Sequence, residues 1–280
     1  MRQVGEHCFV ETKYLGCNIG VILTHEGPIL IDTPALPQDA ADLKAQLKDL
    51  PSRRINRIIY THEHFDHVIG SAYLTRKGIV AHQAVVRDIE YLQRNLGAEI
   101  NRFFPDLYGQ YQAVFDSVEI IPPQITFTRA MTLYAGNLTL ELTHIGGHSP
   151  ASILVYVKED RVLFCGDIVD VGMPFVTPYS RFDEWIAALK LIEGMDAAKI
   201  VPGHDEICSK ETVRATRRYF ETVCERVSAM LSEGASLEQV VKTVDVSDTL
   251  PVPLSSEIAP QVQSTVAMMY EELSEGEEDT

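Results

Sequence analysis

Four potential metal ligands lie within six residues of one another: His62, His64, Asp66 and His67. Neutral imidazole and carboxylate are common protein ligands of zinc and related divalent ions, so this spacing predicts a metal site. In extended chain His62 and His64 point to the same side, because side chains alternate with period two. These two histidines can therefore share one ion. Asp66 and His67 come where the backbone turns toward a helix and would face a second position.

Three further candidate ligands each follow an apolar segment that predicts a strand: His148, Asp167 and His204. Loops at one end of a sheet often gather catalytic groups, because the strands hold them in place while their polar side chains reach solvent. One histidine after one strand would be weak support for a site. Four such positions, counting the first cluster, indicate convergence on one metal site.

Alternating strands and helices are predicted to carry these residues. The expected strands are 14–24, 28–32, 57–60, 79–81, 125–128, 131–134, 138–144, 152–157, 162–167 and 199–204. The expected helices are 37–50, 84–92, one after Ser180, 209–233, 236–244 and 255–273. The three strands between 125 and 144 read as a meander, and the order as a whole favours α/β packing.

Several local features have two interpretations. Residues 95–123 are the least regular part, and their aromatic side chains suit either a lid over a cleft or a hydrophobic cluster that anchors a long loop. Ser180 is expected as a helix N-cap, with Asp183 completing a capping box. His82 is expected to cap a helix or fill a polar junction rather than face the metals. Cys165 is expected as a buried thiol.

The composition is that of an ordinary soluble globular protein: 280 residues, 45% hydrophobic and 23% charged. It favours a single domain over 1–280, with a sandwich over about 1–208, a helical elaboration over about 209–273 and an acidic frayed tail over 274–280. No apolar run approaches the roughly 20 residues that span a bilayer. The N-terminal residues show no signal-peptide pattern, and five scattered cysteines without a C-x-x-C pair suit a reducing compartment. We therefore expect a cytoplasmic protein.

The formal net charge of −16 disfavours nucleic acid as a partner, because phosphate binding depends on Lys and Arg. A small-molecule substrate is the expected partner, and the sequence leaves a homodimer open. The acidic C-terminal end is most simply a solvated terminus.

The chain resembles the metallo-β-lactamase-fold hydrolases of the dinuclear H-x-H-x-D-H type. Four segments carry the resemblance: Thr61-His-Glu-His-Phe-Asp-His67, Gly146-Gly-His-Ser-Pro150, Gly166-Asp167 and Pro202-Gly-His204. The match extends over roughly residues 14 to 205. It implies an α/β fold, a four-layer αββα sandwich here followed by additional C-terminal helices, with a dinuclear site between the sheets.

The resemblance also implies a role for each candidate ligand. His62, His64 and His148 would hold the first ion, whereas Asp66, His67 and His204 would hold the second, and Asp167 would bridge the two. Asp32 matches an aspartate at a strand end that is common in the family, which implies that it orients a ligand histidine. Tyr179 is similar in place to a tyrosine of lactonase-like members that donates to the substrate oxyanion.

Two divalent ions, zinc in the first place and manganese or iron as alternatives, are the cofactors that this set predicts. Neutral histidine ligands leave most of the positive charge on the ion, so a bound water can fall to a pKa of roughly 7 and supply hydroxide. The metal-bound hydroxide could then cleave a small carbonyl substrate: an ester, thioester, lactone or amide. Asp66 could also orient the water or carry a proton.

Two other functions stay open. A mononuclear iron enzyme of the persulfide dioxygenase type would use the same fold and part of the ligand set, and a protein that binds metal or ligand without turnover would retain the site. Many β-lactam-hydrolysing members are secreted and place Cys where Asp167 stands, so an antibiotic-degrading role is disfavoured. No Gly-x-Ser-x-Gly motif supports a serine hydrolase. The substrate itself is left open, because the loops that would select it carry no diagnostic pattern.

Overall fold

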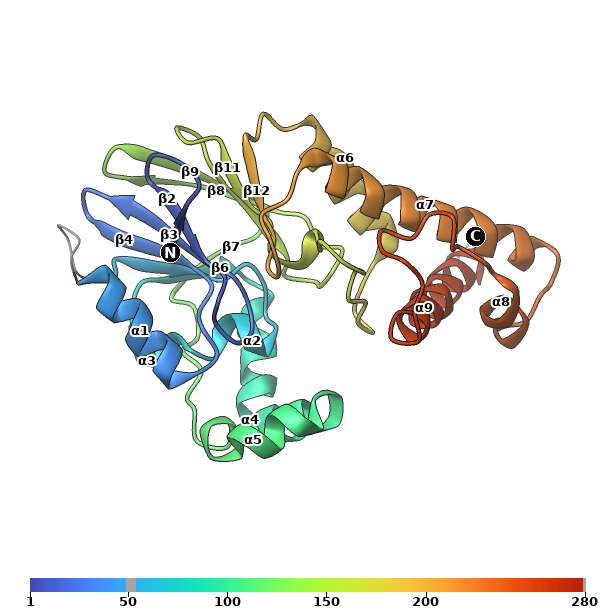
Figure 1. Ribbon diagram of the computed structural model, residues 1–280, viewed down its shortest axis with the longest axis horizontal. Coiled ribbons are helices and arrows are strands. Elements are labelled where there is room, and N and C mark those ends of the chain that lie inside the picture. Colours follow the sequence, from blue (N-terminus) through green and yellow to red (C-terminus); the bar gives the residue numbers. More distant parts are fainter. Residues whose placement is uncertain (49–53, 279–280) are drawn as a thin grey trace.

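Two β-sheets form the centre of the protein, whose computed structural model describes residues 1–48 and 54–278 (Figure 1). The first sheet has the strand order β1 (Arg2–Gln3), β2 (Cys8–Glu11), β3 (Ile19–Thr24), β4 (Gly27–Ile31), β5 (Arg57–Ile59), β6 (Ile79–His82) and β7 (Ile125–Phe127). The second has the order β12 (Lys199–Val201), β11 (Val162–Phe164), β10 (Ile153–Val157), β9 (Leu138–His144) and β8 (Ala130–Ala135). Strands β4 to β7 run parallel to one another, as do β11 and β12, and the remaining pairs are antiparallel.

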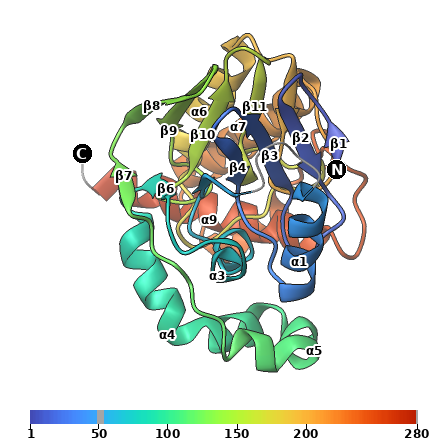
Figure 2. The ribbon, with the colours of Figure 1, turned by 90° about the vertical axis from the view of Figure 1, so that its left-hand side faces the viewer.

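Helices follow the strands and lie outside the two sheets, and those that come after β12 extend away from them (Figures 1 and 2). Those of the first half are α1 (Pro37–Leu47), α2 (Phe65–Val68), α3 (Ser71–Leu74), α4 (Val85–Phe103) and α5 (Pro105–Phe115). A 3₁₀ turn, Gly166–Ile168, follows β11, and the second half adds α6 (Phe182–Gly194), α7 (Lys210–Ser232), α8 (Leu237–Thr243) and α9 (Ala259–Glu278). No helix in residues 1–48 and 54–278 combines the length and hydropathy needed to cross a membrane.

Three hydrophobic clusters separate four layers. Leu30 of β4 packs in the cluster that includes α1 and α4, whereas its neighbours Ile29 and Ile31 pack between the two sheets, because alternate side chains of a strand face opposite sides. Beyond the second sheet, Leu163 of β11 shares a cluster with Trp185 of α6. The predicted order of helix, sheet, sheet and helix is confirmed.

The additional C-terminal helices are also confirmed, and they pack on the second half of the sandwich. Phe220 of α7 and Met269 of α9 are buried in the same cluster as Trp185. Helix α9 continues five residues beyond the expected end at Leu273, so its backbone is helical through most of the acidic segment expected to fray. The predicted helix 37–50 ends at Leu47, and Leu50 lies outside the described residues.

Two predictions about the middle of the chain are wrong. Strand β7 pairs in parallel with β6 of the first sheet, so residues 125–144 are no meander: the chain changes sheets between β7 and β8. Alternation along a strand reveals which side chains are buried but not which sheet the strand joins. The segment 95–123, predicted to be the least regular part, is largely helical. Pro105 does not prevent this, because it occupies the first turn of α5, where proline is well tolerated.

The N-terminus of α6 is capped from a distance. Arg181 is its N-cap residue and makes no side-chain cap, so the predicted cap at Ser180 is wrong. The carboxylate of Glu272 on α9 accepts hydrogen bonds from the backbone N–H groups of Phe182 (2.8 Å) and Asp183 (3.1 Å). A negative charge at a helix N-terminus also interacts favourably with the helix dipole. Glu272 therefore attaches α9 to the start of α6.

We expect Glu272→Ala to lower the free energy of unfolding by about 1 kcal/mol, because two backbone donors lose their acceptor. Thermal unfolding followed by circular dichroism should show a midpoint about 2 to 4 °C lower. Glu275→Ala removes a more exposed carboxylate from the same helix and serves as the control, with an expected shift below about 1 °C. Equal shifts in the two variants would contradict the capping role.

Candidate metal centre

The first cluster of ligands lies where β5 leads into α2. Tyr60 continues the strand direction, His64 is the extended N-cap residue of α2, and Asp66 and His67 occupy its first turn. His62 and His67 are almost completely buried, while His64 and Asp66 are partly exposed. The change from extended chain to helix therefore turns the four side chains toward two adjacent points.

The other three candidates reach the same place from the second sheet. His148 lies in the connection between β9 and β10, after Gly146 and Gly147, whose φ angles of 65° and 87° fall in the region that glycine favours. Asp167 is in the 3₁₀ turn after β11, and His204 follows β12. Because β11 and β12 are parallel neighbours, Asp167 and His204 emerge at one edge of the sheet.

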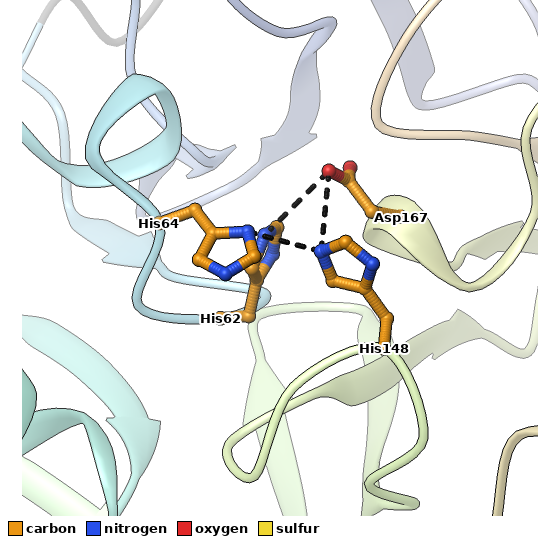
Figure 3. Close-up of side chains that lie close together, drawn as sticks. All are labelled: His62, His64, His148 and Asp167. Carbon is orange, nitrogen blue, oxygen red and sulfur yellow. Dashed lines mark hydrogen bonds and ion pairs between the residues drawn. The ribbon is translucent and has the colours of Figure 1, made fainter. Parts of the chain in front are cut away.

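Four side chains make up the first ligand set: His62, His64, His148 and Asp167 (Figure 3). The His64 Nδ1 atom lies 3.0 Å from His148 Nε2. The Oδ2 atom of Asp167 lies 3.6 Å from the Nε2 atoms of both His62 and His148. The figure shows all four polar ends directed toward a common centre.

The second set, Asp66, His67 and His204, abuts the first and meets it at Asp167. Asp66 Oδ2 lies 3.7 Å from His67 Nε2 and 3.4 Å from His204 Nε2. Asp167 approaches the same two nitrogens at 3.3 Å, with Oδ1 toward His67 and Oδ2 toward His204. One carboxylate is thus shared between the two groups.

These residues fit a pair of divalent ions. With metal–ligand distances of about 2.0 to 2.2 Å, the ligand atoms of a tetrahedral zinc site lie roughly 3.4 Å apart, close to the separations found here. The Nε2 atoms of His62 and His67 and the Oδ1 atom of Asp167 are buried without a hydrogen-bond partner in the described structure. Buried polar atoms normally have partners, so cations held in the two sets would satisfy all three.

Hydrogen bonds on the far side of the rings fix the histidine tautomers. Asp32, which can only accept, receives bonds from the Thr61 hydroxyl and from His67 Nδ1 at 2.7 and 2.8 Å. Since the Thr61 proton goes to Asp32, its oxygen accepts from His62 Nδ1. His204 Nδ1 donates to the Gly16 carbonyl. In all three rings the Nε2 lone pair is left facing the site.

The charges of the cluster favour a positive centre. Burial opposes ionisation of Asp167, yet His67 and His204 hold its pKa well below the usual range. Burial alone would lower the pKa of His204, but Asp167 and Asp66 raise it to about 9. Burial, followed by the nearby His64, lowers the pKa of His148 to about 3. The carboxylates therefore attract positive charge, which a bound cation would supply.

A third group, Cys17 with Asp32 and His67, has ligand atoms close together but is a poor cation site. Burial raises the pKa of Cys17 to about 12, so the thiol stays protonated, and its Sγ donates to the Asp66 carbonyl at 3.2 Å. Metals bind the thiolate form. Cys17 instead supports the backbone of Asp66, and Asp32 supports the ring of His67.

Three other residues with a predicted role, His82, Cys165 and Tyr179, are not part of the cluster. The Nε2 atom of His82 donates to the Thr128 carbonyl and its ring stacks on His144, so the predicted polar-junction role is confirmed. The predicted buried thiol of Cys165 is also confirmed, with Sγ donating to the Val201 carbonyl. Tyr179 is 66% exposed, and no described hydrogen bond of its hydroxyl reaches the cluster.

Sequence reasoning missed the contacts that join the two ligand loops. The Ser149 hydroxyl donates to the Glu63 carboxylate at 2.8 Å, so the neighbour of His148 is tied to the residue between His62 and His64. The sequence also offered no reason to assign a role to Thr61. Ser149 and Thr61 each lie directly beside a predicted ligand, and this position was the available signal.

Comparison with known proteins identifies the family. The model of the metallo-β-lactamase superfamily matches residues 13–204, a range that covers more than half of the chain and contains all seven candidate ligands. The chain belongs to this superfamily. Membership implies divalent metal binding, in agreement with the His and Asp cluster.

Two relatives of this metallo-β-lactamase superfamily member are named as hydrolases. The human protein named acyl-coenzyme A thioesterase MBLAC2 is 27% identical over 256 residues, which cover 84% of this chain and 89% of the relative. A linear primary-alkylsulfatase from Pseudomonas sp. (strain ATCC 19151) is 21% identical, with 88% and 53% covered. These names support the prediction of a metal-dependent hydrolase acting on small substrates.

Solved structures agree on the fold. The stereoselective inverting sec-alkylsulfatase Pisa1 from Pseudomonas sp. has a TM-score of 0.76 at 15% identity, covering 96% of this chain and 49% of its own. A metallo-β-lactamase family protein from Thermus thermophilus has a TM-score of 0.66 at 17% identity, covering 96% and 94%. The chain spans about half the length of the alkylsulfatases that it matches.

We expect Gly203→Ala to disturb the centre directly. An added Cβ would lie 1.9 Å from Asp167 Oδ1 and 3.0 Å from His67 Cε1, so the shared carboxylate would have to move. Metal affinity should fall by more than about tenfold, measured by elemental analysis after dialysis against graded chelator. Gly194→Ala, where the added Cβ meets nothing within 4 Å, is the control and should keep its metal. Full metal retention in Gly203→Ala would contradict the proposed geometry.

Proposed function

We propose that this protein is a dinuclear metal-dependent hydrolase that cleaves a small carbonyl ester or thioester. The observation that carries the proposal is the pair of abutting ligand sets that share Asp167. A single set would suit a mononuclear oxygenase equally well. The second group of a carboxylate and two histidines favours two ions and therefore hydrolysis.

The proposed assignment gives three histidines to the first ion, namely His62, His64 and His148. The second ion would bind Asp66, His67 and His204, with Asp167 common to both. Two such ions, zinc by preference, would lower the pKa of water toward neutrality and polarise a carbonyl oxygen. No side-chain nucleophile is needed.

The remaining residues act by orientation. Asp32, Thr61 and the Gly16 carbonyl hold imidazole protons on the outer side of the rings, so the inner nitrogens stay available. Asp66 is partly exposed, as is His204, but it is the member of the second set that carries a carboxylate, and in this proposal it also orients the attacking water. Tyr179 is kept as a candidate donor to the substrate oxyanion from the loop before α6.

A thioester is the preferred substrate class within this proposal. Its support is the thioesterase name of a relative that aligns over most of both chains. A sulfate ester is the second candidate, favoured by the alkylsulfatase relatives, although they are about twice as long as this chain. Action in the cytoplasm, as a monomer or homodimer, belongs to the same proposal.

The test combines metal content with a substrate panel. Elemental analysis of protein purified without added metal should give two zinc ions per chain, and chelation should abolish turnover until zinc is restored. The panel contains N-acetylcysteamine thioesters, p-nitrophenyl esters, a lactone, an amide and an alkyl sulfate. One iron per chain together with oxygen uptake on glutathione persulfide would overturn the proposal in favour of the dioxygenase. An inert, fully loaded protein that binds ligands tightly would favour a non-catalytic role.

A further inference from the structure

Three phenylalanine rings from distant parts of the chain form a row that begins in the ligand segment of α2. The ring centroids of Phe65 and Phe104 lie 5.8 Å apart, and those of Phe104 and Phe175 lie 6.5 Å apart. Such separations are typical of interacting aromatic pairs. The row consists of these three residues and joins α2, the α4–α5 junction and the loop before α6.

The row begins at the ligands themselves. Phe65 lies between His64, which faces His148, and Asp66, which faces His67 and His204. Phe65 is partly buried, and its carbonyl accepts a hydrogen bond from the Ile69 N–H, which closes the turn of α2. Phe65 is therefore a direct chain neighbour of one ligand from each set, and its ring is partly buried against the hydrophobic cluster that includes α1 and α4.

The outer members are exposed and yet held in place. Phe104 is 39% exposed and sits in non-helical conformation between α4 and α5, where its N–H donates to Ile100 and its carbonyl accepts from Tyr108. Phe175 is 50% exposed, and its N–H donates to the Asp170 carboxylate. An apolar ring of this size gains free energy when it is covered, so two exposed rings in contact indicate a surface that is covered in use.

The loop that carries Phe175 connects the two sides of the metal centre. At one end is Asp170, three residues after Asp167. At the other end the Ser180 hydroxyl donates to the His148 carbonyl at 3.0 Å. The loop that carries Phe175 is thus attached at one end next to Asp167 and at the other end to His148, two members of the first ligand set.

We propose that the row Phe65, Phe104 and Phe175 binds an unbranched aliphatic chain of the substrate, so that the enzyme prefers medium-chain acyl groups to acetyl. This inference rests on the proposed hydrolysis of carbonyl esters and thioesters. The occupant is a chain rather than a protein surface, because three rings offer far less area than a specific protein–protein interface and the first ring belongs to the ligand segment. Each methylene placed on the rings leaves water, which favours longer acyl groups.

The test compares two thioesters of N-acetylcysteamine, acetyl and octanoyl, which differ only in acyl length. Wild-type protein should show a higher kcat/KM for octanoyl than for acetyl. Phe104→Ala and Phe175→Ala should each lower the octanoyl-to-acetyl ratio of kcat/KM by about tenfold, and the double variant should lower it further. Phe104→Leu, which keeps an apolar side chain, should retain most of the ratio.

The control is Tyr134→Ala, which removes a 76% exposed aromatic ring on β8. Its ratio should equal that of the wild type. Metal content and thermal unfolding of every variant show whether a changed ratio reflects the row or a damaged fold. An unchanged ratio in the double variant, with metal and fold intact, would overturn the inference.

A binding measurement separates this inference from the proposed function. Calorimetric titration of the metal-loaded protein with octanoate and with acetate requires no turnover. Tighter binding of octanoate that is lost in the double variant would support the row even if no thioester were cleaved, and only the proposed function would then fail. Equal binding of the two acids would overturn the row even if hydrolysis were observed.

Discussion

Asp167→Asn is expected to leave a folded protein that holds at most one metal ion per chain and has lost nearly all activity. Among the described residues, Asp167 is the side chain shared by both ligand sets, with Oδ1 toward His67 and Oδ2 toward His62, His148 and His204. Asparagine keeps the volume but removes the negative charge. Only its single amide oxygen can bind a metal, whereas both oxygens of the carboxylate can. Both ions should be affected by one substitution.

The expected loss of metal affinity and activity is larger than the loss caused by removing a residue that only orients a ligand. Loss of a side chain that only orients a ligand costs about 10- to 100-fold in metal affinity or activity, so loss of a shared ligand should cost more than roughly 100-fold. Elemental analysis and kcat/KM on the best substrate measure the two effects. Asp196→Asn is a matched control, because the Asp196 side chain is 78% exposed and pairs with Arg161 away from the centre. Two ions and near wild-type activity in Asp167→Asn would contradict the assignment.

The parts of the site that the sequence predicted are those with short-range signals. His62, His64, Asp66 and His67 are neighbours in the chain, and a strand that passes into a helix brings them together without help from elsewhere. His148 and His204 could be named because each follows a glycine after an apolar strand. The recurrence of such positions after strands predicted that they converge on one site, whereas the division of the ligands between two ions depended on the resemblance to a known family.

The parts that the sequence did not predict depend on contacts between distant residues. The local pattern at Ser180 resembles a helix cap, but Glu272, about 90 positions later in the chain, provides the acceptor. Ser180 is thereby free to donate to the His148 carbonyl. In the same way, the Gly16 carbonyl that accepts from His204 leaves no trace in residue type. A backbone acceptor is present at every residue, so only the fold reveals which one is used.

Asp32→Asn is expected to lower metal affinity at the second position by about 10- to 100-fold and to reduce activity in proportion. The two carboxylate oxygens of Asp32 accept from the Thr61 N–H, the Thr61 hydroxyl and His67 Nδ1. Asparagine has only one oxygen. If that oxygen faces the Thr61 N–H, the amide nitrogen faces His67, and the imidazole proton must move to Nε2, where a metal ligand needs a lone pair.

Asp160→Asn is the control for this change, because Asp160 makes a similar set of bonds outside the centre. Its Oδ1 pairs with His7 Nδ1 at 2.9 Å, and its Oδ2 accepts from the backbone N–H groups of His7 and Cys8. Both substitutions should lower the unfolding temperature, whereas only Asp32→Asn should lower metal content. Equal metal content in the two variants at limiting zinc would show that the Asp32 carboxylate supports the fold and not the tautomer of His67. Loss of metal in Asp32→Asn alone would show that the hydrogen bond between Asp32 and His67 sets the tautomer of His67.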